Sequence, residues 1–135
     1  MLSLFTDGGA RGNPGPSAFG VVIKNNQEVV ASFGKTIGIA TNNVAEYSGV
    51  IAAFEYLLSH PILLRENTSA TLFLDSQLIC MQLKGLYRVK HQGLIPLFLR
   101  AKDLEKKLGL KISYTHIPRE QNKLADRQVN LALDK

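Results

Sequence analysis

Four acidic residues are placed where they could act together in catalysis or metal binding: Asp7, Glu46, Asp75 and Asp126. Asp7 and Asp75 each follow a short strand-like segment, and open α/β sheets bind their ligands at the carboxyl ends of strands. These two acids would therefore share one edge of the sheet if their strands are adjacent and parallel. Carboxylates crowded together repel one another unless they are protonated or bind cations. Hard oxygen ligands without a supporting Cys or His cluster favour Mg²⁺ or Mn²⁺ over zinc.

Each of the four acids also has an ordinary structural explanation. Asp7 precedes two glycines and could be a turn residue. Residues 43–46 resemble a capping box, in which Glu46 would bond back to the amide at the helix N-terminus. Asp75 could begin a helix, and Asp126 could be one solvated charge on a helix. A shared site therefore depends on the elements that carry the acids and on the residues around them.

The segments around the acids follow the order β-β-β-α-β-α-α-β-α. Strands are predicted over residues 2–6, 18–24, 28–35, 70–74 and 110–117, and helices over 42–59, 77–86, 94–108 and 120–133. The clearest helical pattern is an apolar stripe at spacings of three and four: Val44, Tyr47, Ile51, Phe54 and Leu58. The first three strands, joined by short turns, are expected to be antiparallel, and the last two, reached through helices, parallel to a neighbour. The prediction is an α/β fold, a mixed five-stranded sheet flanked by helices, in one domain over residues 1–135.

Charge is unevenly distributed along the chain of 135 residues. Residues 84–135 carry twelve basic and five acidic side chains, a net charge of +7, whereas residues 1–83 carry a net charge of −2. A basic half favours a polyanionic partner, of which nucleic acid is the commonest. No apolar run approaches the roughly 18 residues of a membrane span, and no secretory signal is evident. The single cysteine, Cys80, excludes an intramolecular disulfide and a Cys-rich zinc site, so the cytoplasm is the expected compartment.

Four stretches of the sequence together resemble the type I ribonuclease H family. They are Thr6-Asp7-Gly8-Gly9 with Asn13-Pro14-Gly15-Pro16, Thr41 to Tyr47, Asp75-Ser76-Gln77, and Arg119 to Asp126. They occur in the family's order, and the order of elements agrees over nearly the whole chain. The resemblance implies a ribonuclease H-like fold and a catalytic quartet of Asp7, Glu46, Asp75 and Asp126. It also implies that the RNA strand of an RNA–DNA hybrid is cut to 5′-phosphate and 3′-hydroxyl ends.

The expected cofactor is Mg²⁺ or Mn²⁺, with two ions in the site when substrate is bound. In a two-metal site one ion activates the attacking water and the other stabilises the departing oxygen. Asp7 is the expected ligand shared by both ions, so its removal should cost the most activity.

Choosing RNA over DNA requires groups that read the 2′-hydroxyl, and amides suit this because they both donate and accept hydrogen bonds. The resemblance places substrate contacts at a set of mostly polar residues around the acids: Gly8, Asn13, Thr41, Asn42, Asn43, Ser76, Gln77 and Lys90. In the family, the position of Thr41 helps to hold a phosphate of the DNA strand. The alternative for the asparagines is turn and capping duty.

Three further residues are auxiliary candidates. His116 and Arg119 could assist leaving-group protonation or product release, although a lone histidine at a strand end is more often structural. Asn122, one helical turn before Asp126, would orient that carboxylate.

The chain also departs from longer members of the family. It contains no Trp, and the counterpart of their basic, tryptophan-rich protrusion is the short segment 84–91. Hybrid binding is therefore expected to be weaker and more sensitive to salt.

Two other functions stay open on the same fold. One is a non-catalytic nucleic-acid-binding module, which would gain nothing from four acids that face phosphates. The other is a nuclease that acts on double-stranded RNA or DNA junctions. No obligate protein partner is evident, and a monomer is expected.

Overall fold

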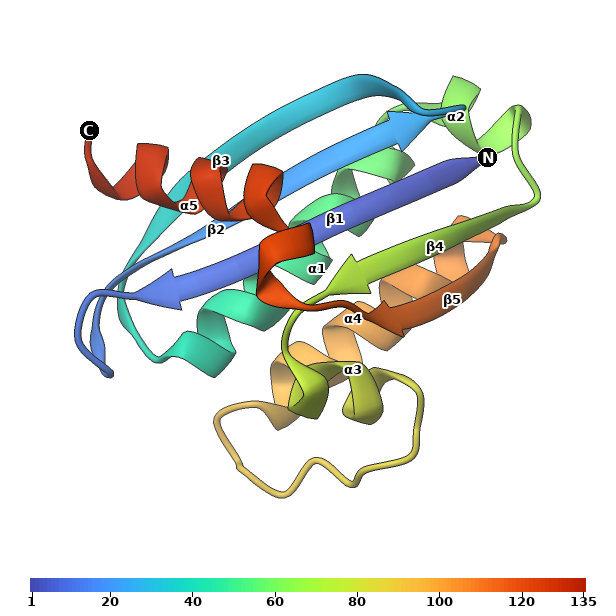
Figure 1. Ribbon diagram of the computed structural model, residues 1–135. Coiled ribbons are helices and arrows are strands. Elements are labelled where there is room, and N and C mark those ends of the chain that lie inside the picture. Colours follow the sequence, from blue (N-terminus) through green and yellow to red (C-terminus); the bar gives the residue numbers. More distant parts are fainter.

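The computed structural model describes all residues from Met1 to Lys135, and its five strands form one mixed sheet (Figure 1). The strands are β1 (Leu2–Ala10), β2 (Gly15–Asn25), β3 (Glu28–Ala40), β4 (Ser69–Leu74) and β5 (Lys111–His116). They lie in the order β3-β2-β1-β4-β5. β1 and β3 each pair with β2 in antiparallel fashion, and β4 is parallel to both β1 and β5. The predicted sheet of three antiparallel and two parallel strands is confirmed.

The first strand is longer than predicted. Its end was expected at Thr6, but pairing with β2 continues from Asp7 opposite Gly20 to Ala10 opposite Ser17. Two glycines in this stretch suggested a loop; they are tolerated because hydrogen bonds to β2 hold the extended backbone. Asp7 therefore lies within a strand, beyond the point where β4 stops pairing with β1.

Helices cover both faces of the sheet (Figure 1). One face carries α1 (Asn42–Leu58), α3 (Gln77–Leu83) and α4 (Ile95–Leu108), and the other carries α5 (Lys123–Leu133) over β2 and β3. A short helix α2 (Pro61–Arg65) and a 3₁₀ turn η1 (Arg119–Gln121) were not predicted. The last helix therefore begins at Lys123 rather than Glu120. None of the helices combines the length and the apolar character that a membrane crossing requires.

The apolar core lies between the sheet and α1. Tyr47 and Phe54, two residues of the predicted stripe, are fully buried. The other three, Val44, Ile51 and Leu58, are only partly buried against the core. The buried face of α1 is wider than the stripe and includes small residues such as Ala45 and Gly49, because the helix packs closely against β1.

Candidate active site

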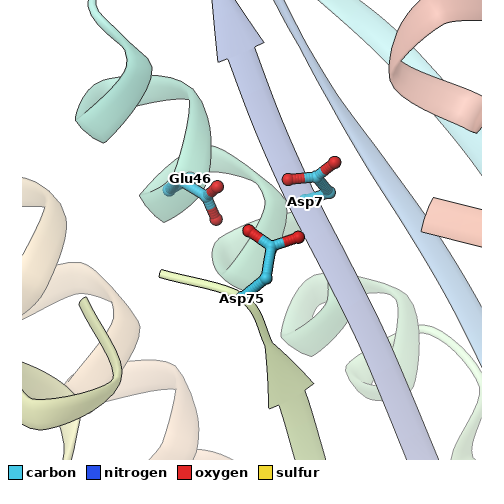
Figure 2. A group of neighbouring side chains, drawn as sticks. All are labelled: Asp7, Glu46 and Asp75. Atoms are coloured by element: carbon cyan, nitrogen blue, oxygen red, sulfur yellow. The ribbon is translucent and has the colours of Figure 1, made fainter. Parts of the chain in front are cut away.

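Three of the four predicted acids converge at one edge of the sheet. Asp7 comes from β1, Glu46 from α1 and Asp75 from the residue that follows β4. Figure 2 shows their side chains pointing toward one another. One carboxylate oxygen from each lies within 4.8 Å of the oxygens of the other two. This spacing allows one small cation to contact all three acids.

The parallel pairing of β1 and β4 explains why the two aspartates meet. Phe5 of β1 is opposite Phe73 of β4. Asp7 and Asp75 each follow two residues later, so the register that pairs the strands also brings these acids side by side.

A close approach between β1 and α1 brings the glutamate to the same point. A Cβ atom on Gly8 would lie 2.2 Å from the carbonyl carbon of Ala45 and 2.3 Å from the backbone nitrogen of Glu46. Only glycine permits this contact, which places Glu46 next to Asp7. The capping-box explanation of Glu46 is wrong, because the hydroxyl of Thr41 caps α1 by accepting from the N–H of Val44 at 3.3 Å.

Burial makes the ionised forms of two acids costly. Asp7 is 5% exposed and Glu46 is 6% exposed. Burial, reinforced by the negative charge of Asp75, raises the pKa of Asp7 from 3.8 to about 7. Burial and then the charge of Asp7 raise the pKa of Glu46 well above its usual 4.5. The N–H of Gly8 donates to Asp7 Oδ1 at 2.9 Å and opposes the rise only in part.

These features fit a bound divalent cation. Glu46 Oε2 is buried and has no hydrogen-bond partner, and a buried polar atom without a partner is costly. A hard cation would give this oxygen a ligand bond and would compensate the crowded negative charge. The donor set is all carboxylate oxygen, which suits Mg²⁺ or Mn²⁺.

The fourth acid lies beside the trio rather than within it. Asp126 lines the same open cleft of about 360 Å³ as Asp7 and Glu46, and its charge helps to raise the pKa of Asp7. Its Oδ2 accepts a hydrogen bond of 3.4 Å from Asn130 Nδ2. The carboxylate therefore borders the cleft but is hydrogen-bonded to a neighbour on its own helix, α5.

The predicted substrate contacts fall into two neighbouring clefts. The acid cleft is lined by Gly8, Asn42, Asn43 and Ser76. A second cleft, also of about 360 Å³, is lined by Asn13, Thr41, Asn43 and Lys90. Asn43 borders both clefts, so they adjoin at the start of α1. Gln77 lines neither cleft and is exposed at the start of α3.

Several of these residues also have the structural duties that were considered as alternatives. Ser76 caps α3 by accepting from the N–H of Ile79 at 3.2 Å. Asn42 Oδ1 accepts from the N–H of Ala10 at 2.8 Å, and Asn13 Oδ1 accepts from the N–H of Asn42 at 3.0 Å. These bonds fasten the loop between β1 and β2 to the start of α1.

The auxiliary residues differ in position. Arg119 is exposed and lines the acid cleft. His116 ends β5, as expected, and its Nε2 lies 3.3 Å from the backbone oxygen of Asp75. The partner expected for Asn122 was wrong: its side chain contacts Asp75 at 3.2 Å and not Asp126. The reason is that η1 turns the chain before α5, which directs Asn122 toward the strands.

The sequence profile of the reverse transcriptase-like family matches residues 5–132. The crystal structure of LC11-RNase H1 in complex with an RNA/DNA hybrid superimposes with a TM-score of 0.92. It is 36% identical, and the match covers 99% of this chain and 97% of that one. The chain belongs to the type I ribonuclease H family.

Curated relatives within the ribonuclease H family are mostly longer. The bifunctional protein Rv2228c of Mycobacterium tuberculosis is 41% identical over 130 residues, which are 95% of this chain and 34% of that protein. Ribonuclease HI of Halobacterium salinarum is 40% identical over 134 residues, which are 98% of this chain and 64% of that protein. The chain thus spans about a third of the length of the first relative and just under two thirds of the length of the second.

Sequence reasoning missed two residues of this ribonuclease H cleft. Arg11 lines the acid cleft and forms an ion pair of 2.7 Å with Asp134 at the end of α5. Asn130 lines it as well. Arg11 is the only basic residue in the glycine-rich segment after Asp7, and Asn130 stands one helical turn after Asp126. Both positions could have been found from these spacings.

Proposed function

We propose that the chain is a metal-dependent endoribonuclease that hydrolyses the RNA strand of RNA–DNA hybrids and leaves 5′-phosphate and 3′-hydroxyl ends. The observation that carries this proposal is the convergence of Asp7, Glu46 and Asp75 within 4.8 Å, beside a cleft that Asp126 also lines. A module that only binds nucleic acid would be harmed by negative charge at this place. The hybrid bound to LC11-RNase H1 supports the substrate class.

The four acids are the proposed ligands of two Mg²⁺ or Mn²⁺ ions in the substrate complex. Such ions activate a water molecule and stabilise the departing 3′ oxygen. We assign Asp7 as the shared ligand because it belongs to the trio with Glu46 and Asp75 and also lines the same cleft as Asp126. Arg119, exposed at the same cleft, is suited to hold a phosphate as the strand is cut and released.

The asparagines are proposed to read the RNA strand mainly as donors. The side-chain oxygens of Asn13 and Asn42 already accept backbone N–H groups. Their amide hydrogens are left to donate to 2′-hydroxyl oxygens or to base acceptors in the minor groove. Asn43 borders both clefts; Gln77, exposed at the start of α3, is proposed as a fourth amide contact.

The second cleft is proposed to hold the backbone of the DNA strand. Arg88, Lys90 and His91 line it together with Thr41. These three residues come from the short segment between α3 and α4, which takes the place of a longer protrusion, and Arg88 and Lys90 supply its positive charge. Contacts of this kind position the duplex but do not read its sequence.

The cleft is complete within one chain, which supports action as a monomer. The only cysteine, Cys80, is free and buried, which supports a reducing compartment, and we place the protein in the cytoplasm.

The test is cleavage of a labelled substrate panel by the purified chain. We expect Mg²⁺- or Mn²⁺-dependent cleavage of the RNA strand of a hybrid, and no cleavage when a chelator is added. Asp75→Asn should bind hybrid without cutting it, whereas the matched control Asp103→Asn, an exposed acid of α4, should cut normally. Binding without cleavage under any divalent ion would favour the binding-module alternative. Preferential cutting of double-stranded RNA or a DNA junction would replace the proposed substrate.

A further inference from the structure

We propose that Asn122 is a positioning residue that holds three of the four acids in register; this inference rests on the proposed function of the site. Asn122 lies at the junction of η1 and α5 and is 1% exposed. It does not line the acid cleft, so it acts through other residues rather than on the substrate.

One amide group reaches two of the elements that carry the acids. Asn122 Nδ2 donates to Asp75 Oδ2 at 3.2 Å and to the backbone oxygen of Thr6 at 2.9 Å. Thr6 directly precedes Asp7 in β1. The side chain therefore ties the strand that carries Asp7 to the carboxylate of Asp75.

The backbone of Asn122 helps to position the third acid, Asp126. The carbonyl oxygen of Asn122 accepts the N–H of Asp126 at 3.1 Å. This bond begins the helical turn on which Asp126 stands. A shift of Asn122 would therefore move Asp126 relative to Asp7 and Asp75.

Helix capping does not explain an asparagine at this position. Asn122 is the N-cap residue of α5, but its side chain makes no capping hydrogen bond. Its Oδ1 is buried and has no hydrogen-bond partner, which is a cost. The side chain is used only as a donor, and both of its hydrogen bonds run toward the acids.

Fixing one oxygen of Asp75 limits rotation of the whole carboxylate, and so sets where its other oxygen can meet a cation. Groups that orient metal ligands in this way typically account for 10- to 100-fold in metal affinity or activity. Asn122 is suited to this duty because its burial excludes water that would compete for Asp75.

The first experiment compares Asn122→Ala with the control Asn67→Ala. Asn67 Nδ2 also makes two hydrogen bonds, to Leu63 O at 2.9 Å and to Asn25 Oδ1 at 3.3 Å, and it contacts none of the acids. Mn²⁺ binding to the substrate-free chain is followed by paramagnetic resonance, and the Mg²⁺ concentration for half-maximal cleavage is measured separately. We expect N122A to weaken Mn²⁺ binding and raise the half-maximal Mg²⁺ concentration by about 10-fold or more. N67A should change neither by more than about twofold.

The second experiment is a double-mutant cycle on unfolding in the absence of metal. If Asn122 holds Asp75, the stability lost through N122A is smaller when Asp75 is already alanine. If N122A does not fold, Asn122→Leu, which keeps the number and branching of the side-chain heavy atoms and removes the donors, takes its place.

The two proposals fail in different ways. A wild-type chain that binds no Mn²⁺ and cuts no hybrid refutes the proposed function, and the cycle then decides whether Asn122 holds Asp75. A wild-type chain that does both, beside a folded N122A with unchanged metal dependence, refutes the positioning role alone. Equal metal effects of N122A and N67A would also refute it.

Discussion

Without metal, the folded chain should lose stability as the pH rises from about 4 to about 7. Burial and the charge of Asp75 raise the pKa of Asp7 from 3.8 to about 7. Between these values the folded chain keeps the proton that the unfolded chain releases. The folded state binds more protons, so its stability falls as the pH rises and levels off above about 7.

The size of the effect follows from the same shift. Each pKa unit corresponds to about 1.36 kcal/mol, so the change from 3.8 to about 7 gives a loss of about 4 kcal/mol from Asp7 alone. Glu46 acts in the same direction, because its pKa is also raised by burial and by the charge of Asp7. If Mg²⁺ binds these carboxylates as proposed, it would compete with the protons and should restore stability above pH 7.

The assay is urea unfolding in chelator between pH 4 and pH 8, with Asp7→Asn as the decisive variant. Asparagine keeps the size of Asp7 and cannot ionise, so the variant should match the wild type near pH 4 and exceed it at pH 8. Mg²⁺ should stabilise the wild type and not the variant. Asp103→Asn, on the exposed side of α4, should follow the wild type. The reasoning would be refuted if the wild type in chelator were equally stable at pH 5 and pH 8. It would also be refuted if the Asp7→Asn variant were less stable than the wild type at pH 8.

Other substitutions test the framework around the acids. Gly8→Ala should lower stability and cleavage together, because its Cβ would lie 2.2 Å from the carbonyl carbon of Ala45; thermal unfolding and hybrid cleavage check this. Phe54→Ala, at 0% exposure, should cost about 3–5 kcal/mol in urea unfolding. Thr41→Ala should remove the cap of α1 and cost about 1 kcal/mol in the same assay. Lys90→Ala should weaken hybrid binding and reduce the slope of log affinity against log salt by about 1.

Local chemistry was enough to predict the sheet. Short turns between the first three strands and helices before the last two fix which neighbours are antiparallel and which are parallel. The end of β1 could not be predicted locally, because Gly8 and Gly9 favour a loop on their own. They stay extended because β2 pairs with them as far as Ala10 opposite Ser17, and that pairing is a tertiary interaction.

Motif spacing and family resemblance were enough to predict which acids form the site. Their arrangement depends on tertiary packing, which the sequence pattern does not reveal. Spacing along α5 suggested that Asn122 serves Asp126, since the two lie one helical turn apart. The side chain instead donates to Asp75 at 3.2 Å, across a gap of 47 residues in sequence. No periodicity within one helix could reveal this contact, because η1 sets the direction of the side chain.

The acid site lowers the stability of the metal-free fold, and this cost indicates what the site is for. A core optimised for stability would not bury Asp7 and Glu46 or leave Glu46 Oε2 unpaired. Gly8 nevertheless permits α1 to pack closely against β1. Asn122 donates hydrogen bonds both to Asp75 and to the backbone of β1. The fold thus holds these carboxylates together with no Lys or Arg among the buried residues. Protonation at low pH relieves this repulsion, and a divalent cation from solution would relieve it at higher pH. The same proximity that destabilises the metal-free chain would therefore favour binding of the proposed metal.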